Sequence, residues 1–240
     1  MTLVANDLLI PIDGAHLHAT LTVPERSEAV ILFAHGSGSS RLSPRNARVA
    51  HALHMRGLAT LLFDLLTNEE AREDEVLRSY RFDIEFLAQR LVTATSWLKR
   101  QRLAPRTLAY FGASTGAAAA LLAAAGTPDD IAAVASRGGR PDLAGRALAS
   151  VQAPTLLIVG GDDRGVLELN ERALKRMHCI KELAVVPGAT HLFEEPGTLD
   201  HAARLAGDWF VRHCAPRDAH QPMRNDEAIR SSTNHEKGAS

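Results

Sequence analysis

Short continuous apolar runs alternate along the chain with longer segments of other patterns, of which residues 84–98 carry apolar residues at spacings of three and four. The continuous runs are typical of strands that are buried on both faces of a parallel sheet. They lie at residues 29–34, 58–63, 108–111, 131–135, 155–159 and 183–186. The segments between them predict helices at residues 44–56, 84–98, 117–125, 143–150, 166–177 and 199–213. Strands that alternate with helices in this way predict an α/β fold with a mainly parallel sheet flanked by helices.

Two segments depart from this alternation. Residues 8–12 and 17–23 are separated by Asp13-Gly14, and Asp-Gly between such runs predicts a β-hairpin, which would form the antiparallel edge of the sheet. Residues 67–80 are polar and acidic, so we expect a solvated surface loop or a frayed helix there. No insertion is long enough for a separate cap domain, so any site at the carboxyl ends of the strands should be open to solvent.

Composition fits one folded domain. Hydrophobic residues make up 45% of the 240 residues, which is enough for a large core without a disulfide or a structural metal. We expect the domain over residues 1–214 and a disordered tail over residues 215–240, because the tail is polar and aperiodic. Cys179 and Cys214 belong to no C-x-x-C pair, which favours free thiols in a reducing cytoplasm.

Charge and hydropathy limit the partners and the location that we expect. The formal net charge of -1 predicts no general attraction to nucleic acid or to an anionic membrane. The N-terminal residues lack the basic and apolar regions of a signal peptide. No apolar run approaches the roughly 18 residues that a membrane-spanning helix needs. We therefore expect a cytoplasmic protein that acts on a small molecule.

The motif that points to chemistry is Gly112-Ala-Ser-Thr-Gly116, between the predicted strand 108–111 and the alanine-rich helix 117–125. In that context a G-x-S-x-G pentapeptide predicts a nucleophile elbow, a sharp turn that exposes the hydroxyl of Ser114 above the sheet. Small residues two positions before and after the serine are needed because the strand and the helix pass close together. The pentapeptide alone is a weak signal, since glycine and serine are common.

Residues that could activate Ser114 follow the later strands. His191 follows the last strand and is the candidate base, because imidazole can take the serine proton near neutral pH and return it to the leaving group. An aspartate must orient the histidine, and Asp162 and Asp163 follow the strand 155–159. Asp142, after the preceding strand, is the runner-up. Ligands of open parallel sheets bind beyond the carboxyl ends of the strands, where all these residues would meet.

Attack on a carbonyl also requires donors for the oxyanion that develops. The backbone N–H of Thr115, directly after the nucleophile, is one candidate. The loop that begins His35-Gly-Ser-Gly offers the other, with the N–H of Ser37 first and that of Gly38 second. Asp64 ends a strand but precedes the nucleophile, so we expect it to organise a loop.

These motifs resemble those of the α/β-hydrolases of the dienelactone-hydrolase-like group, over residues 8–213. The resemblance is carried by His35-Gly36, by residues 112–116, by the run Leu156-Leu-Ile-Val-Gly-Gly-Asp-Asp163 and by Gly188-Ala-Thr-His191. In such enzymes the acid often lies three residues after the glycine that closes its strand, which from Gly160 selects Asp163. Dienelactone hydrolases use a cysteine nucleophile, whereas this chain has Ser114, so the resemblance implies ester-type hydrolysis rather than dienelactone itself.

Four arginines gather in the loops at the predicted catalytic edge: Arg41, Arg45, Arg137 and Arg140. One hypothesis is that some of them, with Arg41, Arg137 and Arg140 as the candidates, bind an anionic group of the substrate, because guanidinium pairs well with carboxylate or phosphate. The simpler interpretation is that they are solvated loop arginines.

The sequence thus predicts a serine hydrolase that cleaves an ester, thioester or lactone through an acyl-enzyme. Acyl transfer to another acceptor would use the same triad, and a non-catalytic binding protein on this fold is the third possibility. No His, Cys or Asp cluster has metal-ligand spacing and no nucleotide-binding glycine motif is present, so we expect neither metal nor cofactor. The sequence leaves the acyl group, the leaving group and the oligomeric state open.

Overall fold

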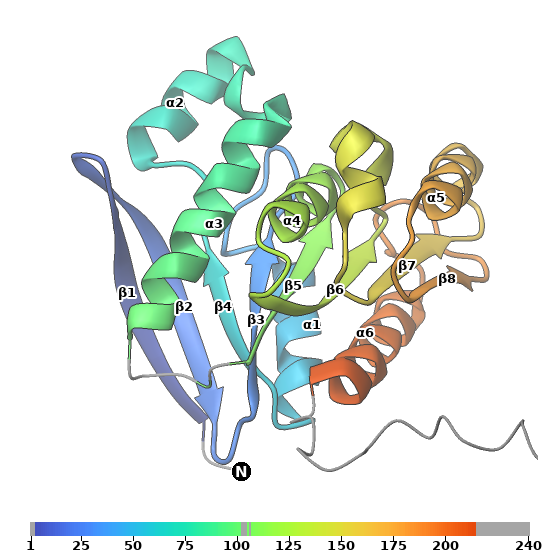
Figure 1. The fold of residues 1–240 in the computed structure, drawn as a ribbon, viewed down its shortest axis with the longest axis horizontal. Coiled ribbons are helices and arrows are strands. Elements are labelled where there is room, and N and C mark those ends of the chain that lie inside the picture. The colour runs from blue at the N-terminus through green and yellow to red at the C-terminus, as the bar shows by residue number, and fades with distance from the viewer. Residues whose placement is uncertain (1–2, 102–104, 106, 215–240) are drawn as a thin grey trace, which may run out of the picture.

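Eight strands form one sheet within residues 3–101, 105 and 107–214, which the computed structural model describes. The order across the sheet is β1-β2-β4-β3-β5-β6-β7-β8 (Figure 1). The strands are β1 (Leu3–Ile12), β2 (Ala15–Pro24), β3 (Ala29–Ala34), β4 (Ala59–Phe63), β5 (Thr107–Ala113), β6 (Ile131–Arg137), β7 (Thr155–Gly160) and β8 (Lys181–Val186). Every described pair from β4 to β8 is parallel, whereas β1 and β2 form an antiparallel hairpin at the edge. The predicted mainly parallel sheet with an N-terminal hairpin is confirmed.

Helices cover both faces of the sheet (Figure 1). The helical elements are α1 (Pro44–His54), α2 (Asn68–Leu77), the 3-10 helix η1 (Tyr80–Phe82), α3 (Ile84–Arg100), α4 (Thr115–Gly126), the 3-10 helix η2 (Pro141–Ser150), α5 (Arg164–Arg176) and α6 (Thr198–Cys214). Residues of α1 and α6 pack in one hydrophobic cluster with the sheet, and residues of α3, α4 and η2 pack in the cluster on the opposite face. Each predicted helix is present, with 143–150 in 3-10 form.

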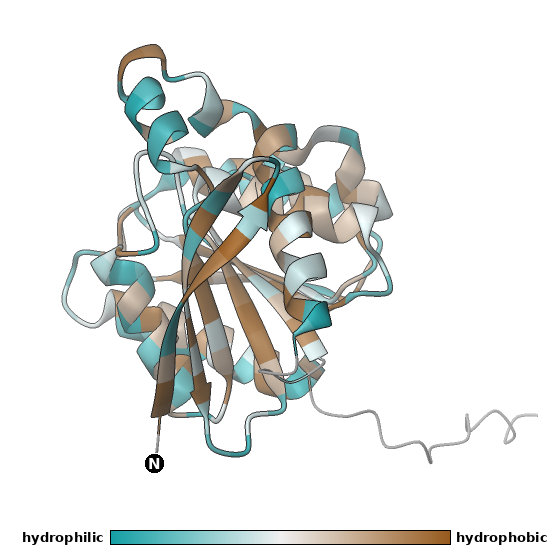
Figure 2. Ribbon diagram, turned by 90° about the vertical axis from the view of Figure 1, so that its left-hand side faces the viewer, coloured by the Kyte–Doolittle hydropathy of each residue, from teal (hydrophilic) through white to brown (hydrophobic). Residues whose placement is uncertain are grey.

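The core follows from the hydrophobic pattern. All six residues of β3 and of β7 are buried, as two-sided burial of continuous apolar runs requires. The central strands are correspondingly the most hydrophobic part of the ribbon in Figure 2, whereas the surrounding helices mix polar and apolar residues. Helix α3 buries the residues that recur every three or four positions along it, Ile84, Leu87, Leu91, Thr95 and Leu98.

The acidic segment 67–80 is more ordered than its composition suggested. It forms α2, whose start is fixed by a capping box in which Thr67 accepts from the N–H of Glu70 and Glu70 accepts from the N–H of Thr67. Asp74 is 2% exposed and forms an ion pair with Arg81 of η1, with Arg81 Nε 2.5 Å from Asp74 Oδ2. The expectation of a solvated loop or frayed helix was therefore wrong for the buried side of α2, because an arginine seven residues later neutralises its carboxylate.

The structure also bears on the expectations for the cysteines and for membrane-spanning helices, but not on the one for the tail. Cys179 and Cys214 are both free thiols. None of the helices in the described residues has the length and hydropathy to cross a membrane. The predicted tail, residues 215–240, lies outside the described residues.

His54 at the end of α1 links that helix to the sheet. Its Nε2 lies 2.8 Å from the hydroxyl of Thr60 on β4, and the side chain is buried. Burial, together with the charge of neighbouring His51, lowers the pKa of His54 to about 4. The folded protein therefore holds this histidine neutral at pH values where the unfolded chain, with an ordinary histidine pKa near about 6.5, binds a proton.

The free energy of unfolding should consequently fall as the pH is lowered from about 6.5 towards 4, by up to about 1.4 kcal/mol per pH unit for each such histidine. Urea unfolding of the wild type and of His54→Gln at pH 7.5, 6.0 and 5.0 measures this. We expect a smaller loss of stability at low pH in the variant, because glutamine can still pair with Thr60 but does not titrate. Equal pH slopes for the two proteins would contradict the assignment.

Candidate active site

The turn between β5 and α4 has the geometry of a nucleophile elbow. Ser114 has φ 51° and ψ −122°, a backbone conformation that is costly for any residue with a side chain. Gly112 and Gly116 allow the close approach that this turn requires. A Cβ on Gly112 would lie 2.4 Å from Cα of Ala117, and a Cβ on Gly116 would lie 2.2 Å from the carbonyl oxygen of Ala34. The two glycines therefore let α4 begin directly above the ends of β5 and β3.

His191 and Asp163 form a hydrogen-bonded pair. Nδ1 of His191 lies 2.7 Å from Oδ2 of Asp163, and the two side chains are 38% and 16% exposed. A carboxylate can only accept, so Nδ1 carries the hydrogen and Nε2 is left as the acceptor. The other two candidate acids are placed differently: Asp162 is exposed, and Asp142 accepts from Nε and Nη2 of Arg140 at 2.9 and 2.8 Å.

The loop after β6 brings His191 towards Ser114. The N–H of Ser114 donates to the carbonyl of Arg137 at 3.3 Å, and the N–H of Arg140 donates to the carbonyl of Ser114 at 3.1 Å. Between these two lies Gly138, with φ 53°, where a Cβ would be 3.0 Å from the carbonyl oxygen of His191 and 3.7 Å from its Cε1. Among the described hydrogen bonds none joins Ser114 to His191, and such bonds are often loose before substrate binds.

The loop after β3 lies against the elbow from the other side. A Cβ on Gly36 would be 3.1 Å from Cβ of Ser114, so the glycine allows direct contact of the two loops. The N–H of Ser37, which the sequence suggested as an oxyanion donor, donates to Oγ1 of Thr115 at 2.9 Å. The two predicted oxyanion residues are thus adjacent, with one N–H held by the hydroxyl of the other residue.

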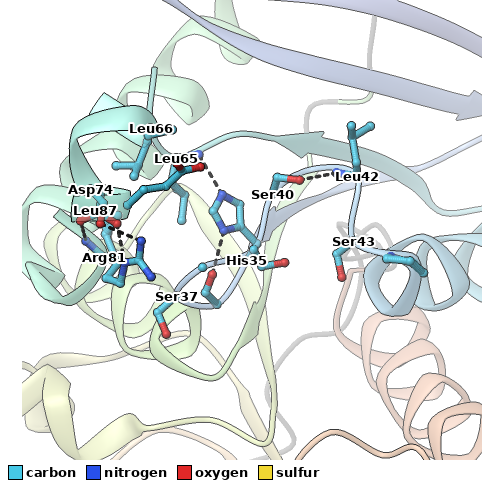
Figure 3. A pocket seen from close by; sticks show the side chains of 16 residues that line it. His35, Ser37, Ser40, Leu42, Ser43, Leu65, Leu66, Asp74, Arg81 and Leu87 are labelled. Atoms are coloured by element: carbon cyan, nitrogen blue, oxygen red, sulfur yellow. Dashed lines mark hydrogen bonds and ion pairs between the residues drawn. The ribbon is translucent and has the colours of Figure 1, made fainter. Parts of the chain in front are cut away.

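His35 fixes the start of this loop. Its Nε2 accepts from the N–H of Leu65 at 3.1 Å, so its Nδ1 carries the hydrogen and donates to the carbonyl of Gly36 at 3.0 Å (Figure 3). Burial lowers the pKa of His35, which keeps the ring neutral and preserves both bonds. The histidine of the His35-Gly36 motif therefore has a structural role, joining the loop after β3 to the segment after β4.

A cavity of about 520 Å³ opens beside the same loop (Figure 3). Its floor includes the loop after β3, and its opposite wall comes from α2, η1 and the start of α3. The lining is mixed, with apolar side chains from Leu42, Leu65, Leu66, Ala71 and Leu87 and polar groups from Ser37, Ser43, Asp74 and Arg81. Sequence reasoning missed Asp74 and Arg81 as lining residues, although the Thr67–Glu70 capping box was a recognisable signal for the helix that carries Asp74.

The four arginines in the loops at the carboxyl ends of the strands differ in their partners. Arg41 pairs with Asp64 at 2.8 Å, and Arg140 pairs with Asp142. Asp64 also accepts from the N–H of Arg41, so it organises the loop as expected. Arg137 is 7% exposed and has no acidic partner among the described residues. Burial, and secondarily the charge of Arg45, lowers the pKa of Arg137 to about 10, so the guanidinium stays protonated at neutral pH.

The described residues contain no group of three or more His, Cys, Asp or Glu side chains that could hold a metal ion. The polar groups at this edge are instead arranged as a serine on a strained turn, a histidine–carboxylate pair and a loop of backbone donors. Such a set can perform acyl transfer through a serine nucleophile.

Solved structures with this fold include esterases and hydrolases. A dienelactone hydrolase from Anabaena variabilis is 50% identical, matches 88% of this chain and 98% of its own, and superposes with a TM-score of 0.85. Est1E from Butyrivibrio proteoclasticus is 17% identical, with coverage of 87% and 99% and a TM-score of 0.72, and thus shares the fold. No family model matches the chain.

A longer protein is similar at the level of sequence. A Mycobacterium tuberculosis protein that is described provisionally as a phosphoribosyl transferase is 60% identical over 198 residues, which are 82% of this chain. The match covers 44% of the mycobacterial protein, so the chain spans less than half the length of that relative.

The close approach at the elbow can be tested with a pair of glycine substitutions in α4. Gly116→Ala should destabilise the fold by about 3 kcal/mol, because the new methyl would meet the backbone carbonyls of Ala34 and His35 at 2.2 and 2.4 Å. Gly126→Ala is the matched control, because nothing lies within 4 Å of the added methyl. Equal free energies of unfolding for the two variants, measured by chemical denaturation, would contradict a close approach of α4 to the strand ends at Gly116.

Proposed function

The chain belongs to the dienelactone-hydrolase-like α/β-hydrolases, and from that premise we propose that it is a serine hydrolase that cleaves an ester, thioester or lactone in a small-molecule substrate. The observation that carries the proposal is the 2.7 Å bond between His191 and Asp163, at the sheet edge where Ser114 occupies a strained elbow. A structural protein or a binding protein has no need for a strained serine beside an oriented imidazole.

In the proposed mechanism Oγ of Ser114 attacks the carbonyl carbon of the substrate while Nε2 of His191 takes the hydroxyl proton. Asp163 holds the tautomer that leaves Nε2 free and stabilises the imidazolium. The bond from the carbonyl carbon to the leaving oxygen or sulfur then breaks, and the imidazolium returns the proton to the leaving group. A water molecule, deprotonated by the same Nε2, hydrolyses the resulting acyl-enzyme.

The oxyanion that forms in each step needs two preorganised donors. In our proposal these are the N–H of Thr115, the first residue of α4, and the N–H of Ser37. The partial positive charge at the start of α4 adds to the first of them. The bond from Ser37 N–H to Oγ1 of Thr115 implies that this N–H becomes shared with the oxyanion, or is released to it, when substrate binds.

We assign the cavity beside the loop after β3 to the body of the substrate. Its volume of about 520 Å³ lies within the range of roughly 300–1,000 Å³ that is usual for small-molecule sites. Leu65, Leu66 and Leu87 offer apolar contacts, and Arg81, held by Asp74, offers a polar one. A substrate with both apolar and hydrogen-bonding groups fits this lining.

The transferase description of the longer mycobacterial relative does not extend to this chain in our proposal. The chain matches 44% of that protein, and the sheet and elbow of this chain are those expected of a hydrolase. The description would then belong to the part that this chain does not match. Transfer of a phosphoribosyl group by this chain, unaffected by loss of Ser114, would contradict this view.

Replacement of Ser114 tests the nucleophile. Ser114→Ala and Ser114→Gly should both lose turnover of activated esters by about 10⁴-fold or more. A fluorophosphonate probe should label the wild type at Ser114 and neither variant. Glycine tolerates φ 51°, so Ser114→Gly should be more stable than Ser114→Ala by about 1–2 kcal/mol. Labelling that persists in the two variants would reject Ser114 as the nucleophile, and product analysis with added alcohol would separate hydrolysis from acyl transfer.

Neighbouring aspartates provide a matched test of the acid. Asp163→Asn should lower kcat by about 10⁴-fold, because an amide does not hold the imidazole in the required tautomer. Asp162→Asn, one residue away and exposed, should keep kcat within a few-fold of the wild type. Steady-state kinetics on one ester substrate would measure both, and a larger loss at Asp162 would overturn the assignment of the triad.

A further inference from the structure

We propose that Arg137 forms an anion-binding site for a carboxylate or phosphate group, beside the loop after β8 that carries His191. Where that group belongs to the substrate, the inference rests on the hydrolase proposal and narrows it to anionic esters. Where the group is a free anion, the site stands independently of that proposal.

The first observation is the state of the guanidinium. Arg137 is 7% exposed, and its Nε and Nη1 are enclosed without any hydrogen-bond partner among the described residues. Buried charged donors are normally paired, because an unpaired ion loses its hydration without compensation. The other arginines at these loops are more exposed and each has a carboxylate partner, with Arg41 on Asp64, Arg45 on Glu194 and Arg140 on Asp142, although Nε of Arg41 is also buried without a partner. Arg137 thus departs from the pattern of its own neighbourhood.

The surroundings of the guanidinium favour an anion rather than another protein group. The ring of Phe193 makes a cation–π contact, with its centroid 5.9 Å from Cζ of Arg137, but it offers no acceptor to the buried Nε and Nη1 donors. Arg45, in the first turn of α1, adds a second positive charge, and no acidic residue stands in that turn. Glu194 is the opposing charge, and it is engaged by Arg45 at 3.3 Å. A bound oxyanion would supply the counter-charge that this cluster lacks.

The position of Arg137 connects the site to the chemistry. Its carbonyl accepts the N–H of Ser114, and the next residue, Gly138, packs against the His191 ring. Phe193, which lies near the guanidinium, is two residues beyond His191 and adopts a strained φ of 56°. A substrate anion held here would fix the ester relative to Ser114.

The unpaired charge of Arg137 also favours the binding of an anion energetically. The folded protein has already paid the desolvation cost of Arg137, so an anion gains the full charge-assisted interaction when it binds. A residue kept only for structure would instead be expected to have its donors satisfied. Arg137 combines buried, unpaired donors with the absence of any carboxylate partner among the described residues, and these donors are therefore available to an anionic ligand.

Binding of inorganic phosphate provides the direct test. Calorimetric titration and thermal unfolding should show that phosphate binds the wild type and raises its Tm, and that Arg137→Gln binds about 10- to 100-fold more weakly. Arg172→Gln removes the same charge from an exposed pair with Glu168 on α5, and should bind phosphate like the wild type. Arg137→Met, which keeps the buried stem without the charge, guards against a folding defect: its Tm without phosphate should be at least that of the wild type, and it should lose the phosphate-dependent increase.

A pair of esters that differ only in one carboxylate distinguishes the two sources of the anion. If the group belongs to the substrate, the wild type should prefer the anionic ester, and Arg137→Gln should lose about 10- to 100-fold in kcat/KM on it but little on the neutral one. If the site takes a free anion, phosphate should bind through Arg137, and Arg137→Gln should change kcat/KM on the two esters by the same factor.

Absence of phosphate binding to the wild type, together with equal effects of Arg137→Gln on both esters, would overturn the proposal. Equal phosphate binding by the wild type, Arg137→Gln and Arg172→Gln would do so as well. If neither ester is cleaved, the hydrolase proposal fails, but the phosphate titration still decides whether Arg137 binds an oxyanion.

Discussion

The close approach of helix α4 to the ends of β5 and β3 is the constraint on which the rest of the site depends. Atoms of neighbouring backbone occupy the space that a side chain at Gly112 or Gly116 would need, so the strand must turn into the helix within one residue. Ser114 is that residue, and its φ of 51° is the cost of the turn. The surrounding sheet and helices hold the strain, because β3 and β6, the predominantly buried strands on either side of β5, leave the turn little room to relax.

The same kind of contact recurs where the other catalytic candidates lie. Gly138 lets the loop after β6 press against His191, and a Cβ at Gly160 would lie 2.2 Å from the carbonyl oxygen of Ala189 in the loop that leads to His191. Glycines at the ends of three neighbouring strands thus draw three loops together above the sheet. Parallel strands place all these ends at one edge, so a few small residues suffice to assemble a serine, a histidine and an aspartate that are far apart in sequence.

Charge at this edge is divided between groups that are neutralised locally and one that is not. Pairs such as Arg41–Asp64, Arg140–Asp142 and Arg81–Asp74 hold loops in place and neutralise both partners locally. Asp163 is left for His191. Arg137 is left without a partner among the described residues, which connects the electrostatics of the scaffold with the choice of substrate in our proposals.

The sequence by itself determined the order of strands and helices, the antiparallel hairpin and the position of the elbow. These features depend on local hydrophobic period and on glycine at fixed offsets, both of which are visible along one chain. The family resemblance favoured Asp163 over its neighbour Asp162, and the tertiary structure shows the physical basis: Asp163 bonds to His191, whereas Asp162 is exposed. The tertiary structure also decided which arginines form ion pairs, since the pairing of a guanidinium with a carboxylate depends on how the loops are arranged in space. For the same reason the acidic segment 67–80 looked solvated in the sequence: the contact between Asp74 and Arg81 that orders it exists only once η1 has folded back on α2.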